Sequence, residues 1–70
     1  MLKIGEYGES VLDFGSGDRV ELHPALDLWM QGARYGNVLP SRPYHKVTMV
    51  RVDVDKVGVR YFAPYDLRKL

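Results

Sequence analysis

Two stretches of alternating apolar and polar residues, residues 17–23 and 46–62, constrain the fold of this chain more than any other feature. Side chains along a β-strand point to opposite faces in turn, so this period predicts strands with one buried face. In the first stretch we expect Val20 and Leu22 to point inward and the polar residues between them outward. Both stretches therefore predict β-structure.

The second stretch is typical of a β-hairpin. Its Asp55-Lys56-Val57-Gly58 segment suits a type I turn in which the glycine takes the left-handed position as a bulge. That turn sets Val52 opposite Phe62 and Asp53 opposite Tyr61. The core face would then hold Val50, Val52 and Phe62, and the other face Arg51, Asp53 and Tyr61.

The remaining segments complete a small β-domain. We expect an arm or edge strand over residues 1–16, a long loop with one helical turn over 24–33, and a short second strand over 33–39. A loop follows at 40–43 because two prolines lie close together. The last segment, 63–70, predicts a tight turn, a helical turn and a final short strand.

Composition limits the chain to one domain and a few chemistries. Its 70 residues include no cysteine, which rules out disulfides and fits a reducing compartment. No signal peptide or membrane span is present in the pattern, so we expect a cytoplasmic protein. The net charge is +1, but residues 1–27 carry two basic and six acidic side chains and residues 28–70 carry eight basic and three acidic ones.

The order of these elements resembles the SH3-like barrel, and in particular its prokaryotic KOW-type modules. The residues that carry the resemblance are Gly17, Asp18, Val20, Gly36, the 46–62 hairpin and Ala63-Pro64-Tyr65-Asp66-Leu67. The resemblance covers residues 17–70 and implies an all-β fold, a small barrel of four to five short antiparallel strands. Residues 1–16, which show no sustained period, are expected to form a flexible N-terminal arm. The resemblance implies nothing specific about function, because many families share this frame.

Enzymatic chemistry lacks its usual parts in this sequence. The two histidines, His23 and His45, lie far apart without carboxylates at ligand spacing, so we expect no metal and no cofactor. There is no cysteine nucleophile, and Ser10, Ser16 and Ser41 lie in turns or loops. One enzymatic alternative is the SH3-like trimethoprim-resistant dihydrofolate reductase. Its resemblance is loose, since Arg60 stands where that family's pore carries glutamine. We therefore do not expect an enzyme.

The second half of the chain mixes cations with aromatic rings, a combination that small barrels use to bind nucleic acid. Arginine and lysine would contact phosphates, and tyrosines would stack on bases. The candidate nucleic-acid-binding residues are Arg34, Tyr35, Arg42, Tyr44, Lys46, Arg51, Arg60 and Tyr61. Ordinary solvated arginines and half-buried tyrosines are the competing interpretation. The pattern leaves DNA, RNA and the oligomeric state open.

A protein partner is the second hypothesis. Leu26, Trp29 and Met30 share helical spacing and could form an exposed apolar anchor for an adaptor or small inhibitor. The same residues could instead form a lid over the open end of the barrel, which the small expected core favours.

Overall fold

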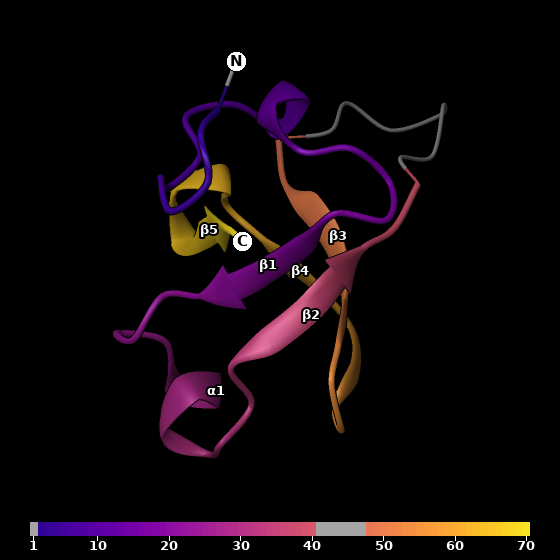
Figure 1. Cartoon of the computed structure of the whole chain (residues 1–70). Coiled ribbons are helices and arrows are strands. Elements are labelled where there is room, and N and C mark those ends of the chain that lie inside the picture. Colours follow the sequence, from indigo (N-terminus) through magenta and orange to yellow (C-terminus); the bar gives the residue numbers. More distant parts are fainter. Residues whose placement is uncertain (1, 41–47) are drawn as a thin grey trace.

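Five short strands form one antiparallel sheet in the order β4-β3-β2-β1-β5 (Figure 1). The structure is a computed structural model and describes residues 2–40 and 48–70. The strands are β1 (Arg19–Leu22), β2 (Tyr35–Val38), β3 (Val50–Val54), β4 (Gly58–Phe62) and β5 (Leu67–Lys69). Short helical turns are η1 (Val11–Asp13), α1 (Asp27–Met30) and η2 (Pro64–Asp66).

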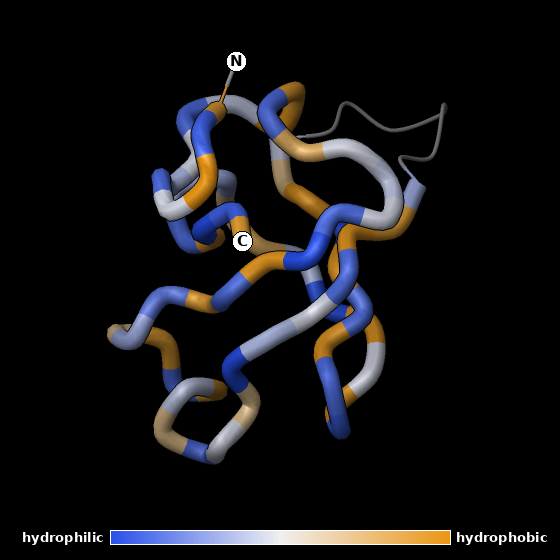
Figure 2. The backbone as a smooth tube through the Cα atoms, in the orientation of Figure 1, coloured by the Kyte–Doolittle hydropathy of each residue, from blue (hydrophilic) through white to orange (hydrophobic). Residues whose placement is uncertain are grey.

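The sheet curls around a single small core, with β1 and β2 crossing in front of β3 and β4 (Figure 1). Every strand contributes at least one buried apolar side chain, and Phe14 and Ala33 add to them from outside the strands. Figure 2 shows the hydrophobic and hydrophilic segments alternating along the strands that enclose this core. The expectation of a small all-β barrel with few helical turns is confirmed.

The β3–β4 hairpin is present, but its register differs by two residues from the expected one. Val50, not Val52, lies opposite Phe62, and Arg51, not Asp53, lies opposite Tyr61. The reason is the turn: the Val57 N–H donates to the Val54 carbonyl (3.1 Å), so the turn begins one residue earlier than expected. A two-residue shift preserves the faces, since side chains alternate with a period of two. Val50, Val52 and Phe62 accordingly are all buried.

The N-terminal arm lies along the free edge of β5. The N–H groups of Gly5 and Gly8 donate to the carbonyls of Lys69 (2.6 Å) and Leu67 (3.1 Å), and Tyr7 forms an antiparallel bridge with Arg68. The arm then makes the turn η1, which the Ser10 side chain caps, and returns Phe14 to the core. Phe14, rather than the exposed Leu12, therefore fills the end of the barrel.

The long loop after β1 carries the expected helical turn, α1. Leu26, Leu28 and Trp29 pack partly against the core, and the Arg34 guanidinium lies over the Trp29 ring, 4.7 Å from its centroid. The interpretation of this loop as a lid fits these contacts. His23 is half-buried beside the Tyr7 ring, and its Nδ1 accepts the Ala25 N–H (3.0 Å).

The outer face of the sheet as a candidate binding site

The surface of the sheet that points away from the core collects most of the polar and aromatic side chains of the strands. Pairing of the strands fixes which residues are neighbours on it. One row runs across four strands, and a pair lies on either side of it. We call this set the outer face: Arg19, Asn37, Asp53 and Val59 in the row, with the pairs Arg51–Tyr61 and Glu21–Tyr35.

Arg51 and Tyr61 place a cation and an exposed ring at opposed positions of the outer face. They lie directly opposite each other on β3 and β4, so their Cβ atoms are neighbours. The Tyr61 side chain is 55% exposed, whereas Arg51 is half-buried and anchored by its position in a central strand. Leu39 flanks Arg51 on the β2 side, where its N–H donates to the Arg51 carbonyl (2.9 Å). An arginine and a flat ring at opposed positions offer one group for a phosphate and one for a base.

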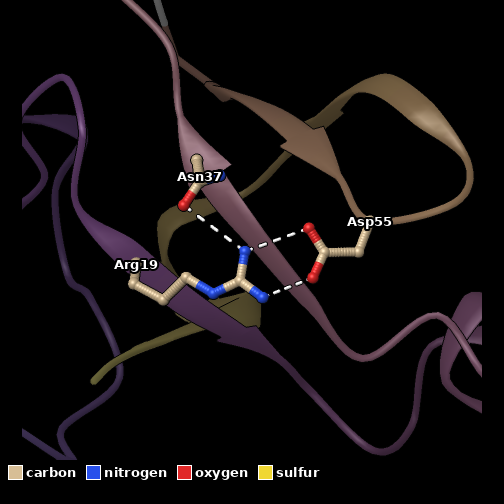
Figure 3. A network of polar contacts seen from close by, with 3 residues as sticks. All are labelled: Arg19, Asn37 and Asp55. Atoms are coloured by element: carbon tan, nitrogen blue, oxygen red, sulfur yellow. Dashed lines mark hydrogen bonds and ion pairs between the residues drawn. The ribbon is translucent and has the colours of Figure 1, made fainter.

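Arg19 joins three segments of the outer face (Figure 3). Its Nη1 donates to Oδ1 of Asp55 (3.0 Å) and to Oδ1 of Asn37 (3.4 Å), while its Nη2 pairs with Oδ2 of Asp55. The guanidinium lies 5.9 Å from the centre of the Tyr35 ring. The fork of Arg19 thus spans β2 and binds the carboxylate that follows β3, a bidentate geometry that adds specificity to the fold.

This contact changes the protonation of both partners. The hydrogen bond from Arg19 holds the pKa of the Asp55 carboxyl below its ordinary value of 3.8, and the same bond raises the pKa of Arg19. Both groups stay charged near neutral pH and neutralise each other. Arg19 is therefore already engaged and is not a free cation for a ligand.

The other carboxylates of this surface are only partly engaged. Glu21 is buried and pairs with Arg68 from β5, and Lys69 lies 3.7 Å from Asp18 at the edge of the sheet. Asp53 is exposed in the middle of the row. The described part of the surface therefore carries cations and carboxylates in balance rather than a strong positive potential.

The structure brings some of the candidate nucleic-acid-binding residues together and separates others. Tyr35, Arg51 and Tyr61 share the outer face. Arg34 lies at the end of the barrel over Trp29, and Arg60 is on the opposite face of β4 from Tyr61, with its Nη1 donating to the Val59 carbonyl (2.8 Å). Arg42, Tyr44 and Lys46 lie outside the described residues.

The structure also separates the three residues of the proposed apolar anchor for a protein partner, Leu26, Trp29 and Met30. Met30 is 83% exposed, but Leu26 and Trp29 pack partly against the core and Arg34 covers a face of the Trp29 ring. Trp29 thus belongs to the lid, and little apolar area other than Met30 is left on α1 for a partner.

Sequence reasoning missed the contact between Arg19 and Asp55. The alternation around Val20 could have placed Arg19 on this face, but its partner is 36 residues away and no local pattern reports it.

Within residues 2–40 and 48–70, no cluster of three or more potential metal ligands occurs, and no helix is long and apolar enough to cross a membrane. Comparison with protein-family models, curated proteins and solved structures found no match. The class of protein defined by the fold is a small all-β barrel.

Proposed function

We propose that this chain is a non-catalytic binding module that holds single-stranded nucleic acid on its outer face. The observation that carries the proposal is the direct pairing of the exposed Tyr61 with Arg51 on adjacent strands. An exposed ring stacks on an unpaired base irrespective of its sequence, and a neighbouring guanidinium contacts the phosphate of the same nucleotide. Tyr35, 40% exposed on β2, supplies a second ring on the same face.

Single strands fit this surface better than duplexes. Rings can stack only on bases that are not already paired, whereas a duplex presents mainly phosphates. The balance of arginines and carboxylates on the described outer face provides little attraction for a duplex backbone. Stacking, rather than charge, is therefore expected to contribute most of the affinity.

Small barrels of the kind that this chain resembles are mostly binding modules, which supports a binding role without naming the ligand. Gly17, Asp18 and Val20, which carry part of that resemblance, lead into and form β1. A chain without cysteine also suits the reducing cytoplasm, where such nucleic acids are found.

Titration of labelled single- and double-stranded DNA and RNA by fluorescence anisotropy tests the proposal. We expect single strands to bind more tightly than duplexes. Tyr61→Ala should weaken binding about tenfold, since stacking on one base contributes about 1–3 kcal/mol. The matched control is Tyr65→Ala, which removes a ring that is 67% exposed on η2, away from the outer face. Equal effects of the two substitutions, or no binding at low salt, would contradict the proposal.

The salt dependence separates the cations that take part from those that do not. Of the candidate cations, Arg51 lies on the outer face, and Arg42 and Lys46 lie outside the described residues. Phosphate contacts from these three would give a slope of log K against log salt of about −2 for a single strand. Adding Arg34 and Arg60 would give about −3.5. Because the structure places Arg34 and Arg60 away from the outer face, we expect the smaller slope. Arg51→Ala should lower the magnitude of this slope by ~0.7 relative to the parent chain.

A further inference from the structure

The N-terminal arm covers one edge strand of the sheet, β5, whereas no strand of the described residues covers the other edge strand, β4. The free edge of β5 is covered by the arm, through the Gly5, Gly8 and Tyr7 contacts described above. At the other edge, no strand of the described residues lies beside β4. Natural proteins protect open edges with proline, several charges or very short strands. β4 has five residues, no proline and one charge, Arg60, and carries the exposed apolar side chains of Val59 and Tyr61.

The pairing of β3 shows which main-chain groups face that open edge. The Leu39 N–H donates to the Arg51 carbonyl, so the main-chain polar groups of Arg51 point toward β2. The polar groups of Val50, Val52 and Val54 therefore point toward β4 and bond Phe62, Arg60 and Gly58. By the same alternation, the N–H and C=O groups of Val59 and Tyr61 point away from β3, into the open edge.

Arg60 partly covers this edge from within the strand. Its guanidinium Nη1 donates to the Val59 carbonyl (2.8 Å), one of the groups that point outward. In the described part of the chain, the Val59 N–H and both main-chain groups of Tyr61 have no protein partner. Such groups are satisfied by water in the free chain and are available to an added strand.

We propose that β4 pairs with β4 of a second copy of this chain, antiparallel about a two-fold axis at Tyr61. In that register Tyr61 of each copy exchanges hydrogen bonds with Tyr61 of the other, and the Ala63 N–H donates to the Val59 carbonyl of the second copy. The Ala63 carbonyl already accepts the Asp66 N–H at the start of η2 (3.0 Å). Ala63 continues β4 in an extended conformation (φ −65°, ψ 147°), which allows it to pair. The two Tyr61 rings become cross-strand neighbours, and Arg60 lies beside Phe62 of the second copy.

A second copy fits this edge because it presents the same outward-facing groups of Val59 and Tyr61, and a two-fold axis sets donors opposite acceptors. Centring the pair on Tyr61 avoids the direct opposition of two Arg60 side chains that a register centred on Arg60 would create. It also joins the two outer faces into one continuous surface. The interface is a single strand pair, which is small, so the expected dissociation constant is on the order of 0.1–1 mM. Arg60 must release the Val59 carbonyl as the strands pair.

Amide hydrogen exchange at about 20 µM and about 1 mM protein tests this pairing. We expect exchange of the edge-facing amides of Tyr61 and Ala63 to slow severalfold at the higher concentration. Exchange at Arg60 and Phe62, whose amides already bond β3, should change much less. Sedimentation velocity over the same range should show a shift toward the dimer.

Two substitutions move the equilibrium in opposite directions without touching Arg51 or Tyr61. Val59→Pro removes an edge-facing N–H but no bond to β3 and should abolish the concentration dependence, whereas Val59→Ala should retain it. Arg60→Ala frees the Val59 carbonyl and should tighten association about threefold or more. A monomer at about 1 mM with unprotected edge amides would overturn the proposal. Association unaffected by Val59→Pro, in a variant whose Arg60 and Phe62 amides remain protected, would also overturn it.

Discussion

Gly36 lies buried in the middle of β2, where the chain leaves no space for a side chain. A Cβ atom there would meet the Val52 side chain at 2.6 Å and the Asp53 carbonyl oxygen at 2.8 Å. The Asp53 oxygen belongs to the backbone of β3 and cannot turn away as a side chain could. The close approach of β2 to β3, and with it the position of Arg51 and Asp53, therefore depends on this glycine.

Gly36→Ala should destabilise the protein by about 1–3 kcal/mol, because the added methyl forces the two strands apart. The control is Gly15→Ala, whose Cβ would be 3.8 Å from its nearest neighbour, Oδ2 of Asp18, an ordinary contact. Urea unfolding followed by circular dichroism measures both. Equal stability of Gly36→Ala and the parent chain would show that β2 can move away from β3 freely.

The carboxyl of Asp55 makes the stability of the fold depend on pH in the acid range. Its pKa is lower in the folded chain than in the unfolded one, because Arg19 donates to it. The stabilisation from this contact is therefore complete above the unfolded pKa and is lost as the pH falls through the folded pKa. Asp13 acts in the same direction, since the N–H groups of Glu9 and Ser10 lower the pKa of its carboxyl.

We expect the melting temperature to fall between about pH 5 and about pH 2, with a smaller fall in Asp55→Asn. The variant should be less stable than the parent near neutral pH and approach it in strong acid. Thermal melts across this range measure the difference. A constant gap between the two proteins at every pH would show that Asp55 acts through packing and not through its charge.

At the scale of the elements, the β3–β4 hairpin shows what the sequence can and cannot predict. Alternation correctly predicted which residues of β3 are buried, and Gly58 has the expected positive φ (101°). The register was wrong because Lys56 also has a positive φ (68°), a conformation for which lysine gives no signal. The outer face was predictable from periodicity. Its Arg19–Asp55 contact was not, since it depends on how strands distant in sequence are paired.

Lys56 is strained by this conformation, and the strain can be relieved. Lys56→Gly should raise stability by about 0.5–1 kcal/mol, because glycine adopts positive φ without a steric penalty. Lys56→Val should lower it, since a branched side chain fits that region poorly. Chemical denaturation of the three proteins gives the order. A loss of stability on Lys56→Gly would indicate that the turn gains more from the lysine side chain than the backbone loses.

At the scale of the whole molecule, a chain of 70 residues encloses its core with help from the arm. Small domains bury a limited share of their surface, so each added contact is a notable part of their stability. The arm covers β5 and delivers Phe14, which is why the barrel is complete only when residues 2–16 are folded against it.

Deleting residues 1–9 should lower stability by roughly 2–4 kcal/mol, since several edge hydrogen bonds to β5 are lost at about 0.5–1.5 kcal/mol each. The deletion retains η1 and Phe14 but removes Leu2, which packs partly against the core, so a share of the loss comes from apolar contacts. Calorimetry measures the loss, and hydrogen exchange locates it at Lys69, whose N–H donates to the Glu6 carbonyl of the arm. The Leu67 N–H, which donates to Pro64, is the internal control. Unchanged protection of the Lys69 amide would mean that the arm does not hold the edge of β5 in solution.

The antiparallel course of the arm beside β5 also decides how the chain responds to tension. Gly5 and Glu6 bond Lys69, and Gly8 bonds Leu67, so the outermost contacts lie nearest to both ends of the chain. A force that draws the two ends apart acts on these hydrogen bonds one after another, beginning with the bonds at Lys69, so they break in sequence and not together. The arm should peel away at low force while the barrel stays closed.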